Sequence, residues 1–268
     1  MIDPAAVAEA AAGAAVVAIL MVQNELGVVQ PIAAIAGAIR RRAPGCHIHV
    51  DAAQALGKIA IDVHALGVDS LAIAGHKLHG PKGSGALWLR AGAALEPLWI
   101  GGGQQRGLRG GTQDAPGAAG LGLAAERATQ ALPTARARWL ELAGGVTARL
   151  AARGAVFRQL VPDQRRAPHI LALGFPGVPA AALRTVLASR GVYISTGSAC
   201  AERPGADAGP LGSMTRGRDA KPSAALEAIG LPADTGMGRL SFGLDTTAEE
   251  VAAATEILAD VVGELAAR

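Results

Sequence analysis

The sequence predicts an α/β fold, in which a larger domain with a mostly parallel sheet precedes a smaller α+β domain. Short apolar runs rich in β-branched residues alternate with Ala-rich stretches, and this alternation is typical of strands joined by helices. Polar side chains follow directly after several of the apolar runs. Of the 268 residues, 50% are hydrophobic and only 18% are charged, a balance that excludes intrinsic disorder and allows a sizeable core.

The elements of the first domain follow from composition and turn signals. An Ala-rich opening favours a helix, and an apolar run that ends at polar residues 23–25 favours a buried parallel strand. Turns are expected at Pro44-Gly45 and at residues 80–83, because Gly and Pro interrupt regular structure there. We therefore expect a helix over 4–15, a strand over 16–22, a helix over 32–41, and strands over 47–50, 70–74 and 85–89.

A Gly-rich loop over 101–111 leads into an Ala-rich helical region from about 116 to 153. Strands are then predicted over 169–173, 192–194 and 239–242, which gives the second domain its α+β character. The domains are predicted at 1–132 and 133–268, with the boundary at Pro133 because proline interrupts helices. The segment 204–221 has few apolar residues and is predicted to be a long, mobile loop.

Charge and cysteine usage exclude several classes of function. The formal net charge is only +3, and the arginines are spread along the chain without aromatic partners, so no nucleic-acid partner is expected. Cys46 and Cys200 stand far apart, which favours a reduced compartment over a disulfide framework. No Lys or Arg precedes Arg40, so no signal peptide is expected, and the apolar run over 14–22 is too short for a membrane span. A cytoplasmic protein without a metal site is predicted.

Lys77 is a candidate catalytic residue because it follows an apolar strand and is one of four lysines in the chain. A lysine can form a Schiff base with a carbonyl group, whereas arginine cannot do so at neutral pH. Asp51 ends the preceding strand, where a carboxylate could keep a pyridine nitrogen protonated. The alternatives are a surface lysine in a turn and an aspartate that caps a following helix.

Cys200 closes a turn of small residues, 195–199, in which the backbone could bring its sulfur close to another molecule. A single cysteine is more often an inert buried residue than a nucleophile, and Cys46 is interpreted in that way.

Five strings of residues occur in one order along nearly the whole chain. Together they resemble the cysteine desulfurases, which are pyridoxal 5'-phosphate enzymes of the class V aminotransferase type. The resemblance implies a fold-type I PLP-dependent transferase, with a truncated, mostly parallel large domain and a smaller C-terminal α+β domain. The strings are QNELG at 23–27, DAAQ at 51–54, GHK with GPKGSGAL at 75–87, GGGQQRGLRGGT at 101–112 and STGSAC at 195–200.

The resemblance implies a role for each polar residue at the cofactor. Lys77 would hold pyridoxal phosphate covalently and then act as the base at the α-carbon of the substrate. Asp51 would pair with the pyridine nitrogen, while Asn24 and Gln54 would hydrogen-bond the phenolic oxygen of the ring. His76 would help to hold the phosphate.

The remaining roles concern the substrate and the partners. Thr112 would reach the phosphate of the neighbouring subunit in a homodimer, and Arg239 would grip the carboxylate of L-cysteine, a bidentate task suited to guanidinium. Cys200 would attack the sulfur of the substrate, which leaves a persulfide on the enzyme and releases L-alanine. The persulfide would then serve a sulfur-acceptor protein in iron–sulfur cluster or thiolation pathways.

The sequence also departs from the family pattern. Ala74 stands where the family usually places a phosphate-binding serine, and the loop after Cys200 is longer than expected. The N-terminal segment that carries a Gly-Thr phosphate loop and a ring-stacking histidine has no counterpart in this sequence. Two alternatives are therefore a catalytically inactive fragment or scaffold of the same fold and a related class V lyase such as a selenocysteine lyase. The small-residue turn before Cys200 favours the desulfurase.

Overall fold

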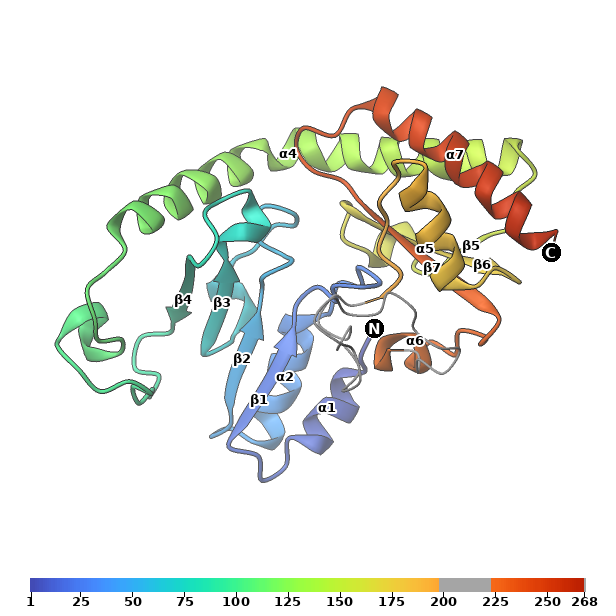
Figure 1. Ribbon diagram of the computed structural model, residues 1–268. Helices are drawn as coiled ribbons and strands as arrows, with labels where there is room; N and C mark the ends of the chain where they lie inside the picture. Colours follow the sequence, from blue (N-terminus) through green and yellow to red (C-terminus); the bar gives the residue numbers. More distant parts are fainter. Residues whose placement is uncertain (198–222, 268) are drawn as a thin grey trace, which may run out of the picture. The chain divides into compact units, whose positions relative to one another are not determined.

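The computed structural model describes residues 1–197 and 223–267 (Figure 1). Their contacts divide the chain into two compact units. Unit 1 comprises Met1–Gln23 and Val29–Pro133, and unit 2 comprises Asn24–Val28 and Thr134–Arg268. Cys200 and the predicted loop over 204–221 lie outside the described residues.

Unit 1 contains a four-stranded sheet in the order β1 (Val16–Leu20), β2 (His47–Asp51), β3 (Ser70–Ala74) and β4 (Gly85–Leu89). The first three strands are parallel and β4 is antiparallel to β3, which confirms the prediction of a mostly parallel sheet. β1 ends two residues earlier than expected because the chain turns back on itself after Leu20. Val22 forms a bridge with Val29, and the Gln30 amide donates to the Met21 carbonyl.

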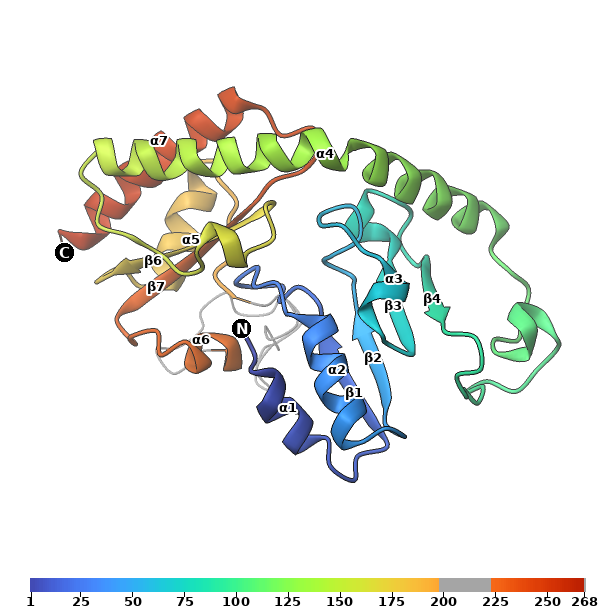
Figure 2. The same ribbon diagram turned by 180° about the vertical axis from the view of Figure 1, so that it is seen from behind.

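The helices of unit 1 are α1 (Pro4–Ala10), α2 (Ile32–Arg42) and the short α3 (Val63–Leu66), and α1 packs against α2 (Figure 2). Asp3 caps α1 through a hydrogen bond to the Ala5 amide, and Pro4 occupies the first turn. α1 is shorter than predicted because turns follow it, with Gly13 in the left-handed region at a φ of 78°.

The two faces of this sheet differ in burial. Ile48 and Val50 of β2 are completely buried on one face. The pairing register places Val16 and Leu20 on the opposite face, and Leu87 shares that face through β3. These three side chains are 57%, 42% and 48% exposed, so this face presents large aliphatic groups to water.

Asp69, directly before β3, ties the elements of unit 1 together. Its side chain forms ion pairs with Arg40 of α2 and Arg90 after β4, and it accepts a 2.8 Å hydrogen bond from the Ile48 amide of β2. Burial raises the pKa of this carboxyl. The hydrogen bonds from Arg40 and Ile48 and the charges of Arg40 and Arg90 outweigh that effect, so the pKa stays below its ordinary value.

Asp69→Asn is expected to lower the free energy of unfolding by about 3 kcal/mol, because it leaves two arginines without their buried partner. The depressed pKa means that this contribution is present above the ordinary aspartate pKa of 3.8 and is lost as the pH falls through the folded-state value. Urea unfolding at pH 7 measures the loss of stability in the variant, and the same measurement at pH 3 shows how much of the Asp69 contribution is lost in acid. Asp260→Asn is the control, since its ion pair with Arg153 is exposed and should contribute under about 0.5 kcal/mol. Equal losses in the two variants would contradict the assignment.

Unit 2 is built on an antiparallel sheet in the order β5 (Arg158–Gln159), β6 (Ile170–Pro176) and β7 (Thr235–Ser241). Its helices include α5 (Ala180–Ser189), α6 (Ala224–Ala228) and α7 (Ala248–Ala266), and α5 contacts both α7 and β7. The predicted strand over 192–194 is wrong. Residues 190–192 close the end of α5 through backbone hydrogen bonds, and only Ser195 forms a bridge with β7, at Arg239.

The helix α4 (Ala115–Ala152) runs through Pro133, where a domain boundary was predicted. Proline removes one backbone hydrogen bond, but the flanking turns remain helical. In unit 2 this helix contributes three fully buried side chains to the core, Trp139, Val146 and Leu150. Among the described residues, no helix combines the length and the hydropathy that crossing a membrane would require.

Candidate active site

Lys77 lies in a short 3-10 helix, η1 (Gly75–Leu78), directly after β3. Leu78 is buried in a cluster with Leu121 and Ala124 of α4, whereas Lys77 is exposed. The turn is closed by hydrogen bonds from the Gly75 amide to the Ser84 carbonyl and from the Gly80 amide to the Gly75 carbonyl. The fixed backbone and the buried Leu78 therefore present Lys77 at the carboxyl end of the strand.

Gly75 allows this turn to form. A Cβ atom at this position would lie 2.2 Å from Ser84 Oγ and 3.1 Å from the carbonyl oxygens of Pro81 and Ser84. Because two of these contacts are with backbone, no side chain fits without a shift of the chain.

Asp51 is the last residue of β2, next to β3 in the sheet. It pairs with Ala72 of β3, and the following Ala52 amide donates to the Ala72 carbonyl. Asp51 and Lys77 therefore extend from the same edge of the sheet, where the carboxyl ends of parallel strands meet. Gln54 lies half-buried in the turns that follow Asp51.

The Asp51 side chain does not cap a helix, so that alternative is wrong. Its Oδ1 accepts a 2.8 Å hydrogen bond from the Ala53 amide, and the next helix is α3, which is capped by Asp62. Within residues 1–197 and 223–267, no further hydrogen bond reaches the Asp51 carboxylate. The second oxygen is therefore available to a ligand.

The two other predicted cofactor residues of unit 1 are exposed. His76 directly precedes Lys77 in η1, and Thr112 follows the Gly-rich loop that contains η2 (Gln104–Gly107). In this loop Gln105 and Arg106 adopt positive φ values of 49° and 60°, an uncommon conformation for residues with side chains.

Arg239 and Asn24 meet in unit 2. Arg239 Nη1 donates to the Asn24 carbonyl oxygen at 2.5 Å. The Arg239 backbone exchanges hydrogen bonds with Ser195, at 2.7 Å and 3.3 Å. Arg239 Nε is buried, and no described residue accepts a hydrogen bond from it. Burial lowers the pKa of the guanidinium, and the charge of Glu25 opposes that shift.

A cavity of about 420 Å³ adjoins Arg239. Residues 193–196 and Ser241 line it together with Arg184 from α5, and all but one of the lining side chains are polar. A guanidinium group that lines a polar cavity of this size is suited to a small anion such as a carboxylate.

Glu25 and Arg184 were not singled out from the sequence. Glu25 stood within the QNELG string, and it is only 4% exposed. A Cβ atom on Gly197 would lie 4.0 Å from Glu25 Oε2, so the carboxylate lies near the segment that leads to Cys200. No sequence signal pointed to Arg184, because its place beside Arg239 depends on the packing of α5.

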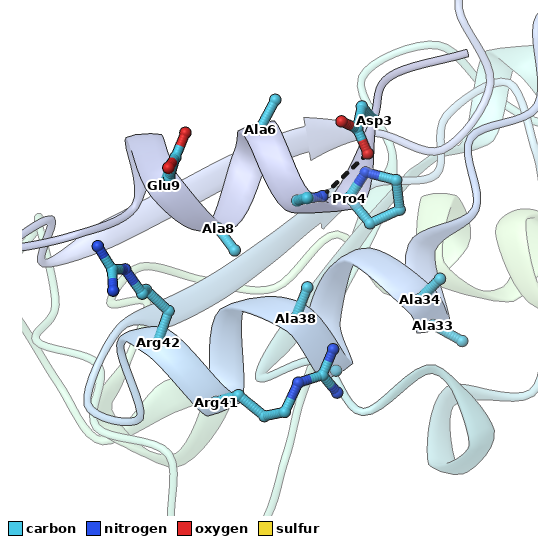
Figure 3. A pocket seen from close by; sticks show the side chains of 12 residues that line it. Asp3, Pro4, Ala6, Ala8, Glu9, Ala33, Ala34, Ala38, Arg41 and Arg42 are labelled. Carbon is cyan, nitrogen blue, oxygen red and sulfur yellow. Dashed lines mark hydrogen bonds between the residues drawn. The ribbon is translucent and has the colours of Figure 1, made fainter.

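A hollow of unit 1 lies between α1 and α2 (Figure 3). It measures about 920 Å³, and its floor consists mainly of alanine side chains, with Arg41, Arg42 and Glu9 at its margin. None of the predicted site residues lines it. Within the described ranges, no three His, Cys, Asp or Glu side chains are grouped closely enough to hold a metal ion.

The sequence matches the aminotransferase class-V family over residues 2–253. A cysteine desulfurase from Nostoc sp. is 36% identical over 94% of this chain and 60% of its own length. The cysteine desulfurase IscS of Methanosarcina thermophila is 34% identical over 93% of the chain and 58% of its own length. The chain thus spans about 60% of the length of the curated relatives that it matches.

Solved structures agree with this similarity. A NifS-like protein superimposes with a TM-score of 0.82 at 28% identity, over 98% of this chain and 65% of its own. DndA from Streptomyces lividans is 32% identical, with a TM-score of 0.56 over 84% of this chain and 60% of its own.

Proposed function

Because this chain belongs to the aminotransferase class-V family, we propose that it carries the main part of a cysteine desulfurase. The reaction converts L-cysteine to L-alanine and leaves a persulfide on the protein for iron–sulfur cluster assembly or thiolation. The proposal depends above all on one observation. Lys77 follows β3 and Asp51 ends the adjacent parallel strand β2, so an amine and a carboxylate extend from one edge of the sheet.

The residues of unit 1 fit pyridoxal 5'-phosphate as the cofactor. Lys77 is exposed and can hold the aldehyde covalently, and Asp51 has an oxygen available for the pyridine nitrogen. Gln54 would bind the phenolic oxygen, His76 would bind the phosphate, and the family resemblance adds Asn24 of unit 2 as a second residue for the phenolic oxygen. When bound, the protonated ring supplies an electron sink for the negative charge that develops at the α-carbon.

The side chains of the protein then divide the work on the substrate. Arg239 would hold the carboxylate of L-cysteine, because it lines the polar cavity of unit 2. Lys77 Nζ would take the proton from the α-carbon and return one to the product. The Cys200 thiolate would attack the substrate sulfur, so that the carbon–sulfur bond breaks, a sulfur–sulfur bond forms and L-alanine leaves.

A cytoplasmic homodimer is part of the proposal. Thr112 would reach the cofactor phosphate of the neighbouring subunit, and the exposed apolar segment before its loop supports an interface there. Leu98, Trp99 and Ile100 are 84%, 62% and 93% exposed, more than isolated surface residues of this kind require.

The experiment incubates the protein with pyridoxal phosphate and L-cysteine, then measures alanine, sulfide and the mass of the cysteine peptides. Cys200→Ala is expected to abolish the persulfide and to lower sulfide release by roughly 10³-fold or more, because the nucleophile is lost. Cys46→Ala is the matched control, since Cys46 is buried and should retain nearly full activity.

Equal activity of the two variants would overturn the role of Cys200. A folded wild-type protein that takes up no pyridoxal phosphate would instead favour the inactive scaffold. Selenide release from selenocysteine without sulfide release from cysteine would favour the related lyase.

A further inference from the structure

Two imidazole rings and one hydroxyl group meet on the sheet of unit 1. His47 and His49 are alternate residues of β2, so their side chains leave the same face of the strand. His47 Nε2 and His49 Nδ1 each lie 2.8 Å from the same atom, Ser70 Oγ of β3. Three atoms that can bind a ligand are therefore grouped at one point, and none of the three residues has a role in the proposed function.

The residue between the two histidines fixes their spacing. The Ile48 side chain is completely buried on the opposite face of the sheet. The Ile48 amide donates to Asp69 Oδ2 at 2.8 Å, and the Asp69 amide donates to the Ile48 carbonyl oxygen at 2.9 Å. Ser70 follows Asp69 directly and is only 3% exposed. The three groups are thus held in place by the fold, which lowers the entropic cost of binding a ligand between them.

A hydroxyl group has only one hydrogen, which limits how it can bind two imidazole rings. Ser70 can donate to one ring nitrogen, and the other ring must then donate to Ser70 Oγ. A neutral imidazole can also carry its hydrogen on its second nitrogen. No described residue binds the second nitrogen of His47 or of His49, so both rings are free to do this. Both rings can then direct a lone pair toward the serine oxygen only if a cation lies between them.

The distances suit a metal ion. Two ligand atoms 2.8 Å apart subtend about 85° at an ion that lies about 2.1 Å from each of them. This angle is close to the 90° between neighbouring ligands in octahedral or tetragonal coordination. Tetragonal sites made of nitrogen and oxygen atoms are typical of Cu²⁺ and Ni²⁺.

The surroundings of the cluster allow a cation to enter. The two histidines are half-buried, and Val16, which pairs with His47, is 57% exposed, so this face is open to water. The paired residues of β1, β3 and β4 add no lysine or arginine to the face. Asp51 stands two positions beyond His49 on the same face, about 7 Å along the strand, and its carboxylate attracts a cation.

We propose that His47, His49 and Ser70 form a binding site for a divalent late transition-metal ion, Ni²⁺ or Cu²⁺, on the open face of β2 and β3. Within the described ranges the site has fewer than three His, Cys, Asp or Glu ligands, so water molecules complete the coordination. The ion links β2 to β3 and thereby stabilises unit 1. This inference does not depend on pyridoxal phosphate or on L-cysteine.

The experiment measures Ni²⁺ binding by isothermal titration calorimetry on the full chain, without an affinity tag and without pyridoxal phosphate. His47→Gln and His49→Gln keep a group that can hydrogen-bond Ser70 but lose the imidazole, and each should weaken Ni²⁺ binding about 100-fold. Ser70→Ala should weaken it about tenfold, because the hydroxyl also orients the two rings. Mg²⁺ should not bind, since it prefers oxygen ligands.

His64→Gln is the matched control, because His64 is an exposed histidine of α3 in the same unit. It should bind Ni²⁺ as tightly as the wild type. Urea unfolding with and without Ni²⁺ gives a second measurement, since an ion that binds only the folded state raises the midpoint. The midpoint should rise in the wild type and in His64→Gln but not in His47→Gln. Unfolding without Ni²⁺ verifies that each variant folds, and if one histidine variant does not fold, the other decides.

No Ni²⁺ binding by the wild type, or equal affinity of the wild type and both histidine variants of the cluster, would overturn the inference. A loss of affinity in His64→Gln as large as that in His47→Gln would overturn it as well, because binding would then not depend on this cluster.

Discussion

Lys77→Ala is expected to remove the covalent attachment of pyridoxal phosphate and to reduce desulfurase activity to background. A primary amine forms the bond that borohydride makes permanent, and this variant loses the amine that is proposed to form it. The measurement is peptide mass mapping after incubation with pyridoxal phosphate and reduction with borohydride. The label in the peptide that contains residue 77 should fall by more than roughly tenfold relative to the wild type.

Lys82→Ala is the matched control, because Lys82 is an exposed lysine in the same turn. It should leave the label at Lys77 intact. Lys58 offers a second comparison, since burial lowers the pKa of its amine and makes it a better nucleophile if it can be reached. A label found mainly on Lys58 or Lys82 would contradict the assignment of Lys77.

Gly236→Ala is expected to destabilise unit 2 severely. A Cβ atom at this position in β7 would lie 2.2 Å from the Val178 carbonyl oxygen and 2.9 Å from the Ala180 amide nitrogen. These atoms belong to the backbone at the start of α5, so the clash can be relieved only by separating the helix from the strand. We expect a loss of about 3–5 kcal/mol, measured by urea unfolding followed by circular dichroism.

Gly263→Ala provides the control for the loss of glycine itself. Gly263 lies inside α7, and no atom would lie within 4 Å of its added Cβ. Alanine is the better helix former, so this variant should gain about 0.5–1 kcal/mol. If both variants change stability by the same amount, the close contact at Gly236 does not constrain the fold.

The sequence correctly predicted the strands that are bounded by neighbouring Gly, Pro or polar residues. β3 and β4 occur at the predicted residues because each is a short apolar run between breakers. β1 was predicted too long and the segment 192–194 was wrongly predicted as a strand, since both depend on which distant backbone the chain meets. Pro133 does not interrupt α4, because a helix stabilised by packing tolerates one missing hydrogen bond, yet the main segments of the two compact units meet between Pro133 and Thr134.

The candidate site likewise combines residues that the sequence identifies with residues that only folding brings together. Lys77 and Asp51 could be singled out because each follows a strand of one sheet, and parallel strands bring their ends together. The contact between Arg239 and the Asn24 carbonyl could not be predicted from the sequence, because the two residues are 215 positions apart along the chain. Glu25 and Arg184 likewise come near Arg239 only in the folded unit.

The exposed aliphatic side chains of Val16, Leu20 and Leu87 also decide how these variants should be studied. Fluorescent dyes that report apolar surface, such as ANS, bind to exposed aliphatic groups on a fully native protein. A strong dye signal at room temperature would therefore not indicate a molten globule, and a dye-based melting curve would start from a high baseline. Spectroscopic probes of the backbone give the true unfolding transition.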